Sequence, residues 1–257
     1  NILYLVTDPF ATKPLYFQLG KNYITVGTYE GTIKAYGNDE PIIQMKSNSI
    51  LAIDLNTFEI ISQKILRPFN FTQQNSMTYD NWNIAFSKSI LKRSTNLQKE
   101  LFVSFSSGQD SGLIAAELLE QKIPFHCYTN RYSEDISILE KRFDILSKSA
   151  ISNTFVEPSK DEFQEMHKFL LENCEPFQLM SNEHDIQNFS DPDMRNLPGY
   201  IAFALICKKA RSNGRLICLS GQGADEIFSD YYNPNTNSRM SELKGDWTNI
   251  DKPWKNF

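Results

Sequence analysis

The chain has 257 residues, a formal net charge of -5 and 40% hydrophobic residues, which fits one large or two modest globular domains. The negative charge argues against a nucleic-acid surface, and no apolar run approaches the roughly 18 residues that span a membrane. No basic segment followed by an apolar one opens the chain, so no secretion signal is visible. The four cysteines show no metal-type spacing and indicate core thiols in a reducing compartment. We therefore expect a cytoplasmic protein with no membrane or nucleic-acid partner.

Residues 1 to about 66 predict short antiparallel strands joined by tight turns. One hairpin is expected to join residues 15–19 to 23–26 through Gly20-Lys21-Asn22, and another to join residues 49–55 to 58–62. This pattern fits part of an antiparallel α+β sandwich.

Residues 67–78 predict a linker, and from residue 79 the hydrophobic period becomes helical. Trp82, Ala85, Phe86 and Ile90 fall on one face of a helix expected over residues 79–93. Strands then alternate with helices. We expect strands at 101–105, 124–129, 153–157 and 215–219, and helices at 112–121, 134–148, 160–172 and 198–211. This order predicts an α/β fold with a parallel, doubly wound sheet over residues 79–257.

The first chemical motif is the run Ser106-Ser107-Gly108-Gln109-Asp110-Ser111-Gly112, which lies between an expected strand and an expected helix. Such a turn gathers free backbone N–H groups at a positive helix end, where an anion can bind. Asp110 adds an oxygen ligand for the Mg²⁺ that accompanies nucleotide phosphates. A Walker loop is excluded, because no lysine follows the glycine. Taken locally, Asp110 or Ser111 could equally be the N-cap of the helix.

The second motif repeats this arrangement near the end of the chain. The buried strand expected at 215–219 runs into Ser220-Gly221-Gln222-Gly223-Ala224-Asp225-Glu226-Ile227-Phe228. In open α/β sheets, ligands bind outside the carboxyl ends of strands. Two such ends, each with an aspartate, can hold one Mg²⁺–pyrophosphate unit between them.

Together these segments resemble a known family. The first is similar to the S-G-G-x-D-S loop of ATP pyrophosphatases. Both motifs resemble the S-G-G-L-D-S and L-S-G-E-G-S-D-E-L-F signatures of asparagine synthetases, and residues 8–17 resemble the D-P-F-G-x-K-P-L-Y-Y segment of the glutaminase half of that family. The resemblance implies a partial N-terminal-nucleophile-type glutaminase domain at 1–66 and an ATP-pyrophosphatase (adenine nucleotide α-hydrolase-like) synthetase domain at 79–257. Against the family, both ends of the chain look cut.

The resemblance also implies site residues. Asp110 and Asp225 would bind Mg²⁺, the backbone of Ser107, Gly108 and Ser111 would cradle pyrophosphate, and the hydroxyls of Ser106 and Ser111 would donate to it. The residues expected around ATP are Ser104, Phe105, Ser106, Ser107, Gly108, Asp110, Ser111, Tyr128, Ser220 and Gly221.

Further residues carry open alternatives. Glu134 and Asp135 match an acidic stretch of the family, but a capped helix start explains them equally well. Arg195 could approach a substrate carboxylate or form a surface ion pair. Gln222 stands where the family has a glutamate linked to catalysis, and an amide cannot act as a base.

The resemblance implies an ATP-dependent ligase and glutamine amidotransferase that adenylates the aspartate side chain and aminates it to asparagine. Its cofactors would be ATP and Mg²⁺, its substrates aspartate and glutamine or ammonia, and a homodimer is left open. Because of Gln222, two alternatives to this function stay open. One is another amide- or lactam-forming enzyme, such as a β-lactam synthetase or peptide cyclase, and the other is a catalytically degenerate nucleotide-binding protein. Glutamine hydrolysis needs an N-terminal cysteine as nucleophile, and Asn1 cannot serve as one. We therefore expect no glutamine hydrolysis by the chain as given.

Overall fold

The computed structural model describes residues 1–9, 12–36, 38–67, 76–131, 134–149, 151–175 and 193–224, and the backbone of β11 (Tyr232–Asn233) and β12 (Ser238–Arg239). The chain divides into two compact units, Asn1–Gln74 with Tyr232–Phe257, and Asn75–Tyr231. The domain limits expected from the sequence stay a prediction.

The first unit contains two three-stranded antiparallel sheets, with the strand orders β1-β5-β6 and β3-β2-β4, and the antiparallel pair β11-β12. Its elements are β1 (Ile2–Val6), β2 (Tyr16–Leu19), β3 (Ile24–Gly27), α1 (Glu30–Lys34), β4 (Ile43–Gln44), β5 (Ser49–Asp54) and β6 (Ile60–Ile65). Both expected hairpins are confirmed, because β2 pairs with β3 and β5 pairs with β6. The sheets share one core that includes Leu5, Phe17 and Ile53. The N-terminal-nucleophile type of this sandwich stays a prediction.

The second unit is built on a parallel sheet with the strand order β10-β7-β8-β9. Its elements are α2 (Asp80–Ser94), β7 (Glu100–Ser104), α3 (Gln109–Glu120), β8 (His126–Thr129), α4 (Ile136–Lys148), β9 (Ser152–Phe155), α5 (Lys160–Asn173), the 3₁₀ turn η1 (Met194–Asn196), α6 (Pro198–Ser212) and β10 (Arg215–Leu219). The predicted α/β fold with a parallel sheet is confirmed.

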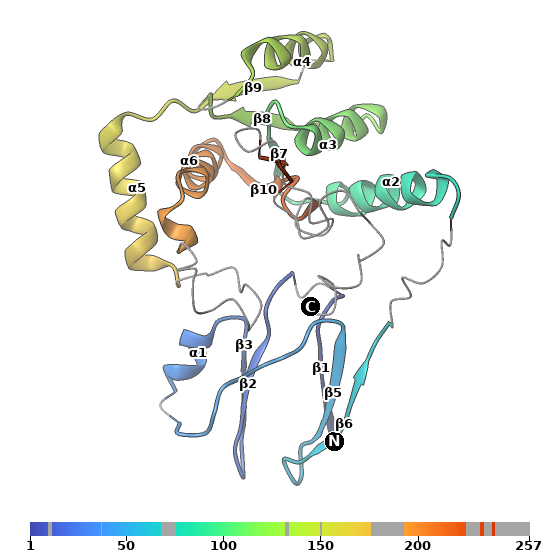
Figure 1. The fold of residues 1–257 in the computed structure, drawn as a ribbon, viewed down its shortest axis with the longest axis vertical. Coiled ribbons are helices and arrows are strands. Elements are labelled where there is room, and N and C mark those ends of the chain that lie inside the picture. The colour runs from blue at the N-terminus through green and yellow to red at the C-terminus, as the bar shows by residue number, and fades with distance from the viewer. Residues whose placement is uncertain are drawn as a thin grey trace. The chain divides into compact units, whose positions relative to one another are not determined.

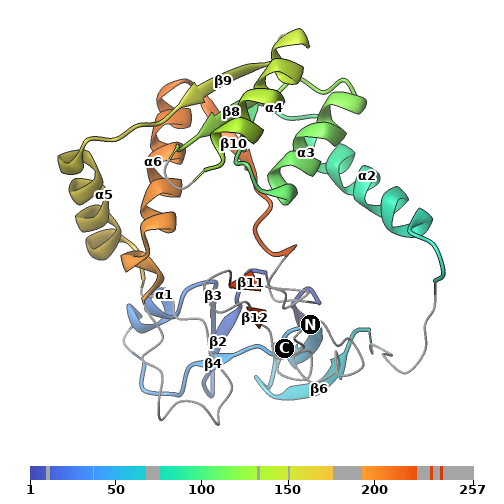
Figure 2. The same ribbon diagram turned by 45° about the horizontal axis from the view of Figure 1, so that its top comes forward.

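Helices cover both faces of this sheet, as Figures 1 and 2 show. Val103 of β7 points to one face, where α2, α3 and α4 contribute Ile90, Leu118 and Leu139 to the core. Phe102, the neighbouring residue, points to the other face and packs with residues of α5 and α6. The alternation along β7 follows from the period of two in a strand. The expected doubly wound arrangement is therefore correct.

Two helices differ from expectation, α3 in where it begins and α2 in how much of it packs on the core. Helix α3 begins at Gln109 with Gly108 as its N-cap, so Asp110 and Ser111 lie inside the first turn and neither is the cap. In α2 only the second half packs on the core. Trp82 and Ala85 are exposed, and the Trp82 ring stacks on Phe86 with the ring centroids 5.2 Å apart. The helical period was correct, but the expected contact face was too long.

The cysteines are free, and burial raises the pKa of the Cys127 and Cys218 thiols to about 12. These two residues match the expected core thiols, whereas Cys174 is exposed and does not. Among the described residues, no helix is both long enough and apolar enough to cross a membrane.

Candidate active site

The loop of residues 105–108 leaves the central strand β7 at its carboxyl end and leads into α3. Gly108 has an extended backbone and gives the helix no side-chain cap. Within the described parts of the chain, the first-turn amides of Gln109, Asp110 and Ser111 have no hydrogen-bond acceptor. Three unfilled donors at the positive end of a twelve-residue helix form an arrangement that binds an anion.

The serine hydroxyls of the loop bond to each other and set its shape. The Oγ atoms of Ser106 and Ser111 lie 2.8 Å apart, the Ser106 amide donates to the Ser111 Oγ at 3.0 Å, and the Gly108 amide donates to the Ser106 Oγ at 3.1 Å. Ser111 is buried. Its hydroxyl therefore organises the loop, and the expected donation to phosphate stays a prediction.

Ser107 holds an acidic side chain that follows β8. Its amide and its hydroxyl both donate to the carboxylate of Glu134. Asp135 is the N-cap of α4 and accepts from the Ile138 amide at 3.2 Å. Hydrogen bonds from Ser137 and Ile138 lower the pKa of the Asp135 carboxyl. Each of the two interpretations of this acidic pair thus applies to one residue: Glu134 contacts the loop, and Asp135 caps a helix.

Arg142 of α4 contacts the other side of the same loop. Its Nη1 donates to the carbonyl oxygens of Ser106 at 2.7 Å and of Gly108 at 2.8 Å. Its guanidinium lies against Gly112, where a Cβ atom would be 2.9 Å from Cζ. Arg142 was not predicted as a site residue from the sequence. The one local signal was Gly112, because the resembling family has a side chain there.

The second loop meets the first one directly. Strand β10 pairs with β7, and residues 220–224 follow its carboxyl end. A Cβ atom at Gly221 would overlap the Cβ of Asp110 and would lie 3.2 Å from the Ser111 amide nitrogen. Gly223 has a φ of 104°, which favours glycine. The absence of a side chain at Gly221 therefore allows the two loops to touch beside Asp110.

The expected Mg²⁺ pair is only half visible. Asp110 is half-buried at the contact of the two loops, while Asp225 lies outside the described residues. No group of three or more potential ligands is found in the described part of the chain. One or two carboxylates fit Mg²⁺, because this ion keeps several waters and takes further oxygens from substrate phosphates.

Two residues expected around adenosine are core residues. The Phe105 side chain packs between the sheet and its helices, and its amide extends the ladder by donating to the Tyr128 carbonyl at 2.8 Å. Tyr128 is 0% exposed, and its hydroxyl accepts from Asn213 at 2.7 Å and from Arg215 at 3.0 Å. Neither side chain is available to a ligand here, so only their backbones could line the site. Ser104 is half-buried and Ser220 is exposed.

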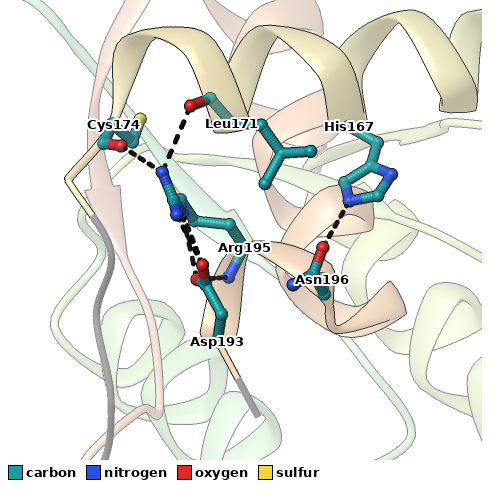
Figure 3. Close-up of polar contacts among 6 residues, drawn as sticks. All are labelled: His167, Leu171, Cys174, Asp193, Arg195 and Asn196. Carbon is teal, nitrogen blue, oxygen red and sulfur yellow. Dashed lines mark hydrogen bonds and ion pairs between the residues drawn. The ribbon is translucent and has the colours of Figure 1, made fainter.

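Arg195 is held by protein atoms, as Figure 3 shows. Its Nε donates to both carboxylate oxygens of Asp193 at 2.9 and 3.0 Å. Its Nη1 donates to the carbonyls of Leu171 and Cys174 at the carboxyl end of α5. Of the two readings left open for Arg195, the structure favours the ion pair. Gln222 is exposed on the second loop, beyond Gly221.

The chain is similar to a curated protein of Methanocaldococcus jannaschii named putative asparagine synthetase (glutamine-hydrolyzing) 1. The two are 26% identical over 90% of this chain and 42% of that protein, so the chain spans about two fifths of the relative that it matches. No family model matches the chain.

Three solved structures show a weaker likeness. The NH3-dependent NAD synthetase from Campylobacter jejuni has a TM-score of 0.37 and 13% identity, covering 59% of this chain and 60% of its own. NMN synthetase from Francisella tularensis has a TM-score of 0.39 and 11% identity, covering 71% and 73%. The ADP complex of the glutamine-dependent NAD+ synthetase from Acinetobacter baumannii has a TM-score of 0.37 and 14% identity, covering 74% and 32%. With TM-scores this low, these likenesses carry no weight for function.

Proposed function

We propose that this chain is the ATP-binding part of an amide ligase of the asparagine synthetase type. The side-chain carboxylate of aspartate attacks the α-phosphorus of ATP, and the bond to the pyrophosphate leaving group breaks. Ammonia, drawn from glutamine, then attacks the acyl carbon of the adenylate and releases AMP. The curated relative from Methanocaldococcus jannaschii supports this class of reaction.

The contact between Gly221 and Asp110 carries the proposal. Neighbouring parallel strands β7 and β10 bring two small-residue loops together at their carboxyl ends, where open α/β sheets bind ligands. If the first loop served only to cap α3, a side chain would satisfy the amides of its first turn. No second loop would then need to pack against the Asp110 carboxylate.

The protein's part in this chemistry is electrostatic. Amides of the first turn of α3 and of Ser107 would bind the pyrophosphate as negative charge develops on it. Asp110, with Asp225, would hold Mg²⁺, which neutralises phosphate charge when bound. The hydroxyl pair of Ser106 and Ser111 holds the loop that carries these donors, whereas the Ser107 amide would have to exchange the Glu134 carboxylate for phosphate.

Gln222 favours a second candidate function. A neutral amide at this position cannot take a proton from the attacking amine, although it can orient a substrate by hydrogen bonding. A related enzyme that activates another carboxylate and forms an amide or lactam is therefore the second candidate. A nucleotide-binding protein without turnover is the third outcome of the test below.

The test is pyrophosphate release by the full-length protein with MgATP, ammonium and aspartate. Ammonium supplies the amine directly, so the result does not depend on glutamine hydrolysis. We expect release that depends on aspartate and is lost in an Asp110→Asn variant. Asp144→Asn is the matched control, because Asp144 is exposed on α4 and pairs only with Lys148 at 2.6 Å among the described residues.

The outcomes separate the candidates. Release that requires a different acid supports the second candidate. ATP binding without release under any acid contradicts both enzymatic candidates. Equal activity of wild-type and Asp110→Asn protein would remove Asp110 from the site.

A further inference from the structure

We propose that Arg142 is a positioning residue of the phosphate-binding loop. By holding two carbonyl oxygens of the loop, its guanidinium turns the adjoining N–H groups toward the anion. This inference rests on the proposed function, because the anion in question is the polyphosphate of ATP.

Peptide geometry supplies the first step. A trans peptide unit is planar, so its C=O and its N–H point in opposite directions. The Ser106 carbonyl and the Ser107 amide share one such unit, and the carbonyl accepts from Arg142 at 2.7 Å. The Ser107 amide therefore points away from Arg142, and there it donates to the carboxylate of Glu134. One amide whose direction Arg142 fixes already binds a negatively charged oxygen.

The same relation holds for the next donor. The Gly108 carbonyl accepts from Arg142 at 2.8 Å, and it shares its peptide unit with the Gln109 amide, the first N–H of α3. The same carbonyls also accept from Ser111 Oγ at 3.4 Å, and Gly108 from the Gly112 amide at 3.4 Å. Without the guanidinium they would keep only these longer, uncharged bonds, and the peptide units could rotate at Gly108. Arg142 thus sets the direction of two N–H groups without touching the ligand.

Two neighbours fix the place of the guanidinium. Gly112 provides the space, since all three guanidinium atoms near it would lie within 3.0 Å of an added Cβ. The Phe105 ring centroid lies 5.9 Å from Cζ, a cation–π distance. Because Arg142 needs a residue without a side chain at 112, the pair Gly112 and Arg142 act as one unit.

The experiment measures the dissociation constants of MgATP and of inorganic pyrophosphate by titration calorimetry with the full chain. Arg142→Gln should weaken both about tenfold or more, which is the order of one or two hydrogen bonds from a charged donor. Arg142→Lys should fall between, because one ammonium cannot reproduce the planar geometry of the guanidinium. Lys141→Gln, which removes the same charge from the neighbouring exposed position of α4, should bind like the wild type.

A double-mutant cycle tests positioning against mere charge. Gly112→Ala should weaken binding in the wild-type background by displacing the guanidinium, and should have little further effect in Arg142→Gln. Amide chemical shifts of Ser107 and Gln109 should move in both single variants, and thermal unfolding should show that each variant is folded.

Each outcome decides something. Wild-type affinity in a folded Arg142→Gln variant overturns the inference, as does equal weakening by Lys141→Gln, which would leave only net charge. Additive effects of Gly112→Ala and Arg142→Gln overturn the coupling of the pair. A wild-type chain that binds neither MgATP nor pyrophosphate contradicts the proposed function, and the inference falls with it.

Discussion

The carboxylate of Glu134 occupies the place at Ser107 where the proposed function puts a phosphate oxygen. The two anions would compete for one amide and one hydroxyl. We expect Glu134→Gln to bind pyrophosphate roughly three- to tenfold more tightly in the absence of Mg²⁺, because a neutral amide is a weaker competitor for these donors. Titration of both proteins at constant ionic strength measures this change. Weaker binding by Glu134→Gln would instead show that the carboxylate supports the site.

A side chain at position 221, where the chain has glycine, would separate the two loops. We expect Gly221→Ala to abolish detectable ATP binding and to destabilise the second unit by about 1–3 kcal/mol, the usual range for overpacking. Urea unfolding and ATP titration measure the two effects. Gly199→Ala is the matched control: nothing lies within 4 Å of its added Cβ, and it sits in the first turn of α6. That variant should keep full binding and stability, so equal losses in both would contradict the packing argument.

At the scale of elements, Arg195 joins the carboxyl end of α5 to the turn η1. It donates to the Leu171 and Cys174 carbonyls that the helix leaves without amides, and its ion pair lowers the pKa of the Asp193 carboxyl. We expect Arg195→Ala to lower the midpoint of thermal unfolding by a few degrees. The affinity for ATP and the KM for the acyl substrate should not change. A raised KM with unchanged stability would restore the substrate-binding reading.

The kinds and order of the elements in the second unit could be predicted from the sequence, because they follow from local periodicity. Apolar runs such as 215–219 are too short for helices, although the expected burial of this strand is wrong for Leu216, which is exposed. The α5 pattern, with the capping box of Ser159 and Glu162, is amphipathic throughout. The start of α3 was less visible. A glycine cap and the small residues after it carry no strong signal, so the helix extends three residues further into the motif than expected.

The candidate site was only partly predictable for a different reason. The motifs located both loops, and the topology of parallel strands implied that they meet. The residues that shape the first loop come from elsewhere: Glu134 and Arg142 are 27 and 34 to 36 positions distant from their partners. Such tertiary contacts depend on how α4 packs, which no local pattern encodes. The same holds for Tyr128, whose strand was expected. Its hydroxyl accepts from Asn213 and from Arg215 at the amino end of β10, whereas the two loops lie at the carboxyl ends of the strands.

At the scale of the whole molecule, we expect stability to depend on pH through a charged cluster at the amino ends of the parallel strands. The first residues of β7, β8 and β10 are Glu100, His126 and Arg215. The Arg215 guanidinium lies 2.7 Å from the His126 Nε2 and 3.2 Å from the Glu100 carboxylate. Arginine can only donate, so Nε2 must accept, and the proton of the neutral ring then sits on Nδ1, which contacts the Ser152 hydroxyl. A second proton on Nε2 would break this bond and place two cations in contact.

Protonation of His126 should therefore destabilise the fold. Burial and the Arg215 charge lower the pKa of His126 below its ordinary value of 6.5, against the opposing effect of Glu100. Between the lowered pKa and 6.5 the unfolded chain binds more protons than the folded one, so the free energy of unfolding falls as the pH falls through this window.

We expect the urea midpoint to decrease from pH 7.5 to 5.5 in the wild type, and to decrease less in His126→Gln. The carboxyls with lowered pKa values, Glu40, Asp135, Glu162 and Asp193, respond only at more acidic pH. His167→Gln, which removes a histidine from α5 and leaves the cluster intact, should retain the wild-type slope. The same slope in His126→Gln as in the wild type would assign the pH dependence to another group.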